Sequence, residues 1–428
     1  MKIAKARLID RGQNEIYGTA AIALSLFVFA YSVRFGQVSI LFYYALWLPL
    51  VLVDYRRVLG DYVRYSWIFA FAAFACLSVF WSAAPSATAR TALQYLTHVV
   101  CALIAMRTIN IRTLSRGAVI GAGLVLMYSL LFGVYHLDPL DGGYSFVGAF
   151  ASKNQLGFYA SLAVYFSFCA IFILSERRQW LLISAGVSLL AAYSLMASQS
   201  ATSILTTFAV VAMAIGLRLF QALRPSSRRK LLVVGGILAI AGSFVFLNAG
   251  GADIVLGAFG KDSTLTGRTY LWQQGVEAAR ANLFFGVGYQ AYWVQGLSEA
   301  ERLWDEFYIG SRSGFHFHNT FIETAVETGL IGLVLLCIVL VVTVTGHFGR
   351  WVKNAVDPEA AVLFGLAVLL TIRGFVEVDI LAPYHAGSFL LYYAAGVLAD
   401  RRRVPQLQPA GYRGRAGQSV ASDSWVRR

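Results

Sequence analysis

The sequence predicts an all-α integral membrane protein with about twelve transmembrane helices, both termini in the cytoplasm and one large periplasmic loop. Hydrophobic residues make up 58% of the 428 residues and charged residues only 13%, whereas a soluble chain has roughly 25% charged residues. The apolar residues gather in runs of about 20, the length that a helix needs to cross a bilayer. Basic residues favour every second gap between these runs, as expected for loops that alternate between two sides of a membrane.

Twelve apolar runs can be placed along the chain. Each is long enough for one span, because a helix rises about 1.5 Å per residue and the hydrocarbon core is about 30 Å thick. The runs are centred near Leu24, Ala45, Phe74, Val99, Val125, Val164, Val187, Phe208, Leu238, Leu333, Leu366 and Tyr393. The seventh and eighth are nearly continuous, so one long run divided at residues 198–202 is the alternative there.

The basic residues predict the orientation of these spans. With the N-terminus in the cytoplasm, 26 of the 35 Lys and Arg residues fall in segments predicted to lie inside. Cytoplasmic loops of membrane proteins carry such an excess. Topology therefore explains the net charge of +13, and we expect no binding to nucleic acid.

The long polar gap gives the chain its domain organisation. We expect a cytoplasmic N-terminus (1–15), spans 1–9 (16–248), a periplasmic loop (249–318), spans 10–12 (319–403) and a disordered cytoplasmic tail (404–428) rich in Gly, Arg, Ser and Pro. The loop is too long for a simple connection. Within it, residues 266–281 carry apolar side chains at helical spacing, which predicts an amphipathic helix capped by Thr266.

The end of this loop carries a candidate catalytic residue. His318 and Asn319 are followed, after nine residues, by Gly-Leu-Ile-Gly at 329–332, where a polar segment gives way to an apolar one. An imidazole titrates near neutral pH and suits a general base, and Asn319 could orient it. A histidine at a span end can also be a simple interfacial anchor, and His316 is a second candidate two residues away.

Two further charged groups accompany this histidine. Glu323 lies in the outer part of the tenth span, where an ionisable residue is a functional candidate unless it sits in water above the bilayer. Arg268 begins the amphipathic helix, and a guanidinium at a helix N-terminus can bind phosphate. The alternative for Arg268 is a solvated residue that makes no functional contact.

A second charged cluster lies near the outer end of the eleventh span. The i, i+4 spacing of Arg373 and Glu377 favours a pair on one helix face, although with Asp379 they could position a sugar or phosphate in a cavity. Lys153 and Asn154 begin the sixth span on the same side. Lys153 could extend to the interface or contact pyrophosphate.

The sequence has no pattern typical of a nucleotide or metal site. A Walker A loop, HExxH, the Cys/His spacings of zinc sites and Asp-x-Asp do not occur in it. We therefore expect no cofactor and no metal.

Taken together, these elements resemble the O-antigen ligase and Wzy-type polysaccharide polymerase superfamily, bacterial membrane glycosyltransferases of the GT-C type. The resemblance rests on the His-Asn element with its Gly-x-x-Gly, on Thr-Gly-Arg at 266–268, on Trp272 and on Gly-x-Gly-Tyr at 286–289. The Lys153-Asn154 pair, the Ser-rich stretch 198–202 and the region 373–379 are most similar to the exopolysaccharide polymerase (ExoQ-like) branch. By topology the resemblance covers roughly residues 60–400, while its motifs cover short pieces.

The resemblance implies a metal-independent, inverting glycosyl transfer on the periplasmic side of the bacterial inner membrane. The donor would be an oligosaccharide on undecaprenyl pyrophosphate, and the acceptor a sugar hydroxyl of a growing polymer. The implied partners also include the lipid bilayer and other polysaccharide assembly proteins. The implied site residues are His318 as the catalytic base, Arg268, Lys153 and Arg373 at the pyrophosphate, and Asn319, Asn154, Glu323 and Glu377 in support.

One departure from the family pattern bears on the choice of acceptor. Many ligases carry an arginine in the Ser-rich turn where this chain has Ala201, so a second cation would have to come from Lys153 or Arg373. This favours a polymerase over an O-antigen ligase, whose acceptor is lipid A-core. A flippase for lipid-linked sugars is the remaining alternative, but polar groups here collect on one side instead of lining a path through the membrane.

Overall fold

The computed structural model describes residues 4–60, 62–137, 143–221, 227, 230, 234–235, 267–354 and 356–400. Most of the predicted ninth span, the first part of the predicted periplasmic loop and the C-terminal tail lie outside these residues.

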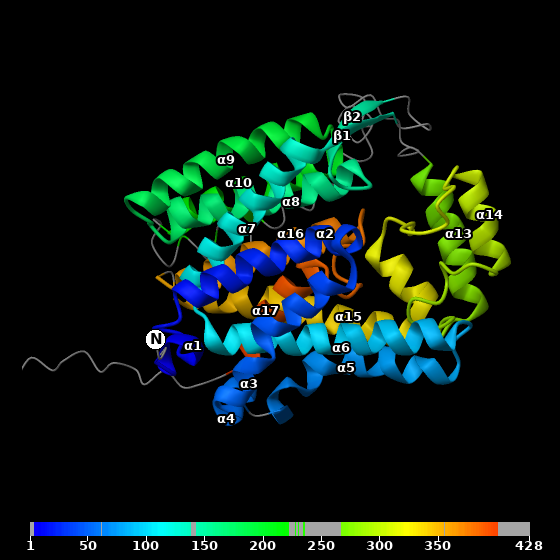
Figure 1. Ribbon diagram of the computed structural model, residues 1–428, viewed down its shortest axis with the longest axis horizontal. Helices are drawn as coiled ribbons and strands as arrows, with labels where there is room; N and C mark the ends of the chain where they lie inside the picture. Colours follow the sequence, from blue (N-terminus) through cyan, green and yellow to red (C-terminus); the bar gives the residue numbers. More distant parts are fainter. Residues whose placement is uncertain are drawn as a thin grey trace, which may run out of the picture.

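The described chain is a bundle of helices with one small β-hairpin (Figure 1). The helices are α1 (Ala6–Ile9), α2 (Ile16–Trp47), α3 (Pro49–Val53), α4 (Tyr55–Leu59), η1 (Tyr62–Tyr65), α5 (Ser66–Leu77), η2 (Ser78–Phe80), α6 (Pro85–Thr108), α7 (Ile111–Phe132), α8 (Lys153–Phe168), η3 (Cys169–Ile173), α9 (Gln179–Ala197), α10 (Ala201–Gln221), α13 (Arg268–Ala281), α14 (Ser298–Glu306), α15 (Thr320–Lys353), α16 (Pro358–Gly374) and α17 (Ala386–Ala399). The strands are β1 (Val134–Leu137) and β2 (Tyr144–Gly148).

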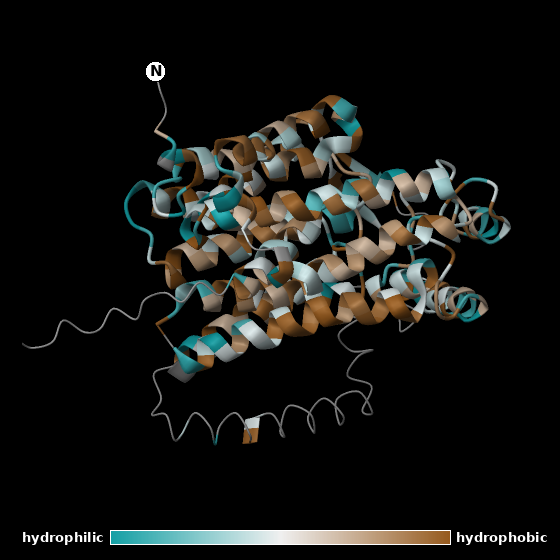
Figure 2. Cartoon of the chain, turned by 90° about the horizontal axis from the view of Figure 1, so that it is seen from below, coloured by the Kyte–Doolittle hydropathy of each residue, from teal (hydrophilic) through white to brown (hydrophobic). Residues whose placement is uncertain are grey.

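Within the described residues, seven helical segments are long and apolar enough to cross a membrane. They are Ile16–Val53, Tyr55–Phe80, Pro85–Thr108, Ile111–Phe132, Lys153–Ile173, Gln179–Ala197 and Thr320–Lys353. Hydrophobic residues run along the helices, while many hydrophilic ones lie at helix ends and in loops (Figure 2). The chain is thus a mostly helical, multi-pass membrane protein, whereas the count of twelve spans and their orientation stay predictions.

The first of these segments folds back on itself. Non-helical backbone at Tyr31 and at Gly36, whose φ is +66°, interrupts α2. Beyond this break, Leu46 accepts a hydrogen bond from the Tyr17 hydroxyl, and Nε1 of Trp47 donates to the Ser25 hydroxyl at 2.9 Å. The two runs predicted around Leu24 and Ala45 therefore pack side by side as two arms.

Segments that the charge pattern predicts to lie inside meet at one end of the bundle, where α1 lies (Figure 1). Ion pairs there join Arg57 to Asp10, Arg107 to Asp400 and Arg11 to Glu359, at 2.7, 2.5 and 3.3 Å. Helices α13 and α14, from the predicted periplasmic loop, lie at the opposite end (Figure 1). This is the arrangement that alternating spans require.

The β-hairpin departs from the all-α expectation. Strands β1 and β2 pair antiparallel, with Tyr135 opposite Phe146. The rings of Tyr135 and Tyr144 stack at 5.3 Å between centroids. Aromatic and β-branched residues favour strands, and such cross-strand ring contacts stabilise a hairpin where no bilayer demands a helix.

The predicted amphipathic helix is present as α13 but begins two residues later than expected. Its N-cap is Gly267, in the left-handed region with φ of +81° and with no side-chain cap. The proposed cap, Thr266, lies outside the described residues. Leu271 and Gly275 face inward, and a methyl group added at Gly275 would lie 2.5 Å from Cγ2 of Ile322 in α15. Helix α13 thus packs directly on the helix that follows His318.

Candidate active site

The segment that precedes α15 presents His318 in an unusual conformation. Its φ is +51°, in the left-handed region that a non-glycine residue seldom adopts. The next residue, Asn319, caps α15, because its side-chain oxygen accepts from the backbone N–H groups of Phe321 and Ile322 at 3.0 and 3.1 Å. The amide of Asn319 donates to the Phe375 carbonyl at 2.9 Å. Asn319 therefore positions the backbone on both sides of the turn, and within the described contacts it does not hold the imidazole as we had expected.

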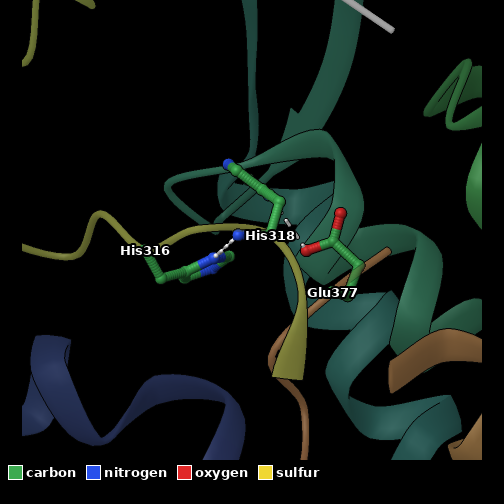
Figure 3. Close-up of side chains that lie close together, drawn as sticks. All are labelled: His316, His318 and Glu377. Atoms are coloured by element: carbon green, nitrogen blue, oxygen red, sulfur yellow. Dashed lines mark hydrogen bonds and ion pairs between the residues drawn. The ribbon is translucent and has the colours of Figure 1, made fainter. Parts of the chain in front are cut away.

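The carboxylate of Glu377 lies between the predicted catalytic and phosphate-binding residues. Oε2 of Glu377 is 3.4 Å from Nδ1 of His318 (Figure 3). Oε1 accepts from Nη2 of Arg268 at 2.7 Å and from the amide of Asn154 at 2.7 Å. The hydroxyl of Thr320 donates to the Glu377 backbone carbonyl at 2.7 Å. Three segments far apart in the sequence, those of Asn154, Arg268 and His318, therefore converge on one side chain that is only 6% exposed.

Electrostatics keep Glu377 ionised. Burial alone would raise its pKa, but the imidazole of His318 and the guanidinium of Arg268 outweigh burial and hold the pKa of Glu377 well below its usual value. A carboxylate only accepts hydrogen bonds, so the nitrogen of His318 that faces it carries the proton. In the neutral form of His318, Nε2 then carries the lone pair that a base requires.

His316 contacts the catalytic candidate through the backbone. Its Nδ1 accepts the backbone N–H of His318 at 3.1 Å, and the two imidazole rings lie edge to face with centroids 4.3 Å apart (Figure 3). Burial is the main cause that lowers the pKa of His316 to about 3, and the neighbouring His318 adds to it. His316 is therefore a neutral hydrogen-bond acceptor that holds the turn, a role that sequence reasoning did not foresee.

Glu323 anchors the same turn from the first turn of α15. Its carboxylate accepts from Nε1 of Trp293 and from the backbone N–H of Phe317, both at 2.8 Å. Its side chain is buried, at 2% exposure. Glu323 and Trp293 therefore fix the backbone immediately before His318. Trp293 was not among the predicted site residues. Its position in an aromatic stretch of the loop was the only signal in the sequence that could have identified it.

The glycine elements of the sequence join the predicted periplasmic loop to a break in α15. Gly329 has φ of +62°, and a methyl group there would lie 2.2 Å from the carbonyl carbon of Phe284. The break frees the carbonyls of Val326 and Glu327, which accept from the backbone N–H groups of Val287 and Gly288 at 3.0 and 2.8 Å. The Gly-x-Gly-Tyr element thus forms backbone bonds with the helix that begins directly after Asn319.

Arg373 forms contacts other than the expected one. The predicted i, i+4 pair between Arg373 and Glu377 is wrong, because α16 ends at Gly374 and the following residues leave the helix. Nε of Arg373 instead donates to Asp379 at 2.6 Å, and Nη1 donates to the Ser203 hydroxyl at 3.0 Å. Its Nη2 is buried and has no hydrogen-bond partner among the described residues.

A chain of polar side chains connects the two arginines. Asn154, which donates to Glu377, accepts from the Ser200 hydroxyl at 2.9 Å, and the Ser200 and Ser203 hydroxyls are hydrogen-bonded at 3.0 Å. Ser203 in turn accepts from Arg373. Lys153 begins α8 beside Asn154, as the sequence predicted. The Ser-rich turn at 198–202 was visible in the sequence, but its connection to Arg373 depends on how α8, α10 and α16 pack.

His316, His318 and Glu377 also offer a possible set of metal ligands, with one ligand atom from each lying within 4.8 Å of the others. Two of these groups already have partners. Oε1 of Glu377 accepts from Arg268 and Asn154, and Nδ1 of His316 accepts from the His318 backbone. The adjacent guanidinium also disfavours a second cation. The donor set therefore fits hydrogen bonding and proton transfer better than metal binding.

Two comparisons relate the chain to known proteins. Residues 186–337 match the family described as O-antigen ligase (Wzy_C). The chain is 64% identical over 414 residues to the exopolysaccharide production protein ExoQ of Rhizobium meliloti (strain 1021), a match that covers 96% of this chain and 95% of that protein.

Proposed function

Since the chain belongs to the O-antigen ligase family, together with the exopolysaccharide production protein ExoQ, we propose that it is a polysaccharide polymerase. It transfers an oligosaccharide from undecaprenyl pyrophosphate to a sugar hydroxyl of an acceptor glycan. The reaction takes place on the periplasmic side of the bacterial inner membrane. The observation that carries this proposal is the convergence of a histidine base and an arginine on the one carboxylate of Glu377.

His318 acts on the acceptor. Nε2 of His318 takes the hydroxyl proton as the acceptor oxygen forms its bond to the anomeric carbon. The bond from that carbon to the phosphate oxygen breaks at the same time, and undecaprenyl pyrophosphate leaves with the electron pair. One direct displacement inverts the anomeric centre. Glu377 supports the step because its negative charge stabilises the imidazolium that forms.

Arg268 acts on the leaving group. Its guanidinium stands at the first turn of α13, where backbone N–H groups add to the positive potential. Before the donor binds, Nη1 and Nη2 of Arg268 donate to the Val376 carbonyl and to Glu377 at 2.9 and 2.7 Å. Pyrophosphate oxygens are strong acceptors for such a fork. Neutralising their charge makes the pyrophosphate a better leaving group.

We assign the second cation to Arg373, with Lys153 as the alternative. Arg373 reaches the Ser-rich turn through Ser203, close in sequence to Ala201, and its buried Nη2 has no hydrogen-bond partner among the described residues. Asn154 connects this turn to Glu377 and supports both arginines. Asn319 and Glu323 hold the His318 turn.

The acceptor distinguishes this proposal from ligation. The matched family is described as O-antigen ligase, and transfer to lipid A-core is the second candidate. The relative that matches nearly the whole chain is named for exopolysaccharide production, which supports polymerisation, in which the acceptor is another lipid-linked chain. In a cell, other polysaccharide assembly proteins and the bilayer would be its partners.

Reconstitution of the purified chain in vesicles tests the proposal. The substrate is a defined undecaprenyl-pyrophosphate oligosaccharide, with and without lipid A-core, in buffer containing EDTA. We expect longer lipid-linked chains to form in EDTA without lipid A-core. Transfer only to lipid A-core would identify a ligase, relocation without new bonds a flippase, and loss of transfer in EDTA a metal-dependent enzyme.

A further inference from the structure

A row of aromatic rings leads from the surface of the periplasmic loop to His318. The ring of Tyr270 stacks with that of Phe307, with centroids 6.4 Å apart and an interplanar angle of 23°. The ring centroids of Phe307 and Phe315 are 5.4 Å apart, and those of Phe315 and the His318 imidazole are 6.0 Å apart. We call Tyr270, Phe307 and Phe315 the aromatic track.

The aromatic track adjoins the proposed active site at two places, one near Arg268 and one at His318. Tyr270 lies on the first turn of α13, two residues after Arg268. Phe307 packs against the N-cap of the same helix, since a methyl group added at Gly267 would lie 3.2 Å from its Cε1 atom. At the other end, Phe315 precedes His318 by three residues and contacts its ring.

The track lies at the edge of the interior of the loop. The centre of that interior contains Tyr292, Trp304 and Phe317, which are 3%, 1% and 0% exposed, and Phe307 and Phe315 pack against this cluster from outside. Tyr270 is 41% exposed, and Phe307 and Phe315 are each partly exposed. Ring surface therefore remains available along the whole track in the part of the chain that the structure describes.

Polar side chains border the exposed end of the track. The Tyr270 hydroxyl donates to Glu306 at 3.0 Å and accepts from Arg302 at 3.1 Å. Arg302 also pairs with Glu306 at 2.6 Å and donates to Gln274. These planar amide, carboxylate and guanidinium groups have donors and acceptors at the edge of an aromatic face.

We propose that the aromatic track binds the sugar units of the acceptor glycan. A pyranose ring presents C–H groups on a face, which pack on the negative face of an aromatic ring, and hydroxyls at its edge, which hydrogen-bond to polar neighbours. The track ends at His318, the base that takes the acceptor proton, so a chain lying on it delivers its terminal hydroxyl to that base. This inference rests on the proposed function.

A longer acceptor covers more rings and binds more tightly, while the reacting atoms stay the same. The donor enters with its pyrophosphate on Arg268 and its lipid in the bilayer. Removal of the outermost ring should therefore weaken binding of long acceptors and leave short ones unaffected.

The test measures transfer to acceptors of one and three repeat units, prepared by hydrolysis of the host's own exopolysaccharide. The variants are Tyr270→Ala, Tyr270→Phe and, as the matched control, Tyr308→Ala, which removes a ring that is 74% exposed on the same loop but outside the track. For Tyr270→Ala we expect the KM of the long acceptor to rise about 3- to 10-fold, the loss of one ring contact. The kcat and the donor KM should not change, and the other two variants should match the wild type.

An unchanged KM for the long acceptor in Tyr270→Ala would overturn the proposal, as would a rise in the donor KM instead. Saturation-transfer NMR of the free three-repeat oligosaccharide with the purified full chain separates this inference from catalysis. If the chain has no transferase activity but binds the oligosaccharide in a way that depends on Tyr270, the proposed function is contradicted and the aromatic track still stands as a sugar-binding site. Transfer by the wild type without Tyr270-dependent binding would contradict the track alone.

Discussion

Arg268 and Glu377 are 109 residues apart in the chain, yet Nη2 of Arg268 lies 2.7 Å from Oε1 of Glu377. The same carboxylate faces His318 through its other oxygen. This arrangement couples the two halves of the proposed reaction. Glu377 orients His318 and also pairs with Arg268. In the proposed reaction, the pyrophosphate of the donor competes with Glu377 for this guanidinium.

Replacing Glu377 with Gln should slow the reaction. The variant keeps the size of the side chain but removes the charge that stabilises the His318 imidazolium and pairs with Arg268. We expect kcat to fall about 10²-fold, the lower range for loss of general-base assistance, in a chain that still reaches the membrane. Steady-state transfer with purified protein measures this. Wild-type kcat in Glu377→Gln would show that the carboxylate has no part in catalysis.

His316 should make the folded protein sensitive to acid. Burial lowers its pKa from 6.5 to about 3, so between these pH values the unfolded chain binds a proton that the folded chain does not. Stability therefore falls as the pH drops below 6.5, by at most about 1.4 kcal/mol per pH unit.

A variant that cannot titrate tests this effect. Asn in place of His316 still offers an oxygen to the His318 backbone N–H. We expect the melting temperature of His316→Asn in detergent to fall less than that of the wild type between pH 7.5 and pH 5. Parallel changes in the two proteins would contradict the prediction.

The positive charge of Arg373 should help to bind the donor pyrophosphate, in addition to stabilising the fold. Removing it alone leaves the half-buried Asp379 without its guanidinium partner, which destabilises by up to about 3 kcal/mol, the lower end for a broken buried pair. The double variant Arg373→Met/Asp379→Asn removes both charges and should restore folded protein. We expect this protein to reach normal membrane levels but to have a higher donor KM. A normal donor KM would assign the second cation to Lys153 instead.

Gly329 should be essential for the fold of the site. An alanine there would adopt an unfavourable positive φ, and its methyl group would overlap the backbone of Phe284. We expect Gly329→Ala to lower the folded yield and the melting temperature strongly. Gly310→Ala is the matched control, because a methyl group at Gly310 meets no atom within 4 Å. Equal melting temperatures for the two variants would contradict this role.

Much of the architecture could be predicted from the sequence, because the bilayer imposes length and composition on each span. The mostly helical membrane fold and helix α13 are confirmed, and so is the family resemblance. The chain reversal within α2 was also implied by two separate apolar runs around Leu24 and Ala45.

The partners of individual charges could not be predicted in the same way. The helical spacing of Arg373 and Glu377 suggested a pair, but α16 ends one residue after Arg373, and each side chain then finds a partner on a distant segment. Nothing local in the sequence shows that His316 accepts the His318 backbone N–H, since that contact depends on the positive φ of His318. The first set of contacts depends on how the helices pack, and the second on the backbone conformation of the turn before α15.

The most direct test of the account is single-turnover transfer by His318→Ala with a defined undecaprenyl-pyrophosphate oligosaccharide. The matched control is His136→Ala, which removes an exposed imidazole from strand β1. If His318 takes the acceptor proton, its loss should slow the chemical step by about 10²- to 10⁴-fold while donor binding persists. His136→Ala should match the wild type. Transfer by His318→Ala at the wild-type rate would contradict the account.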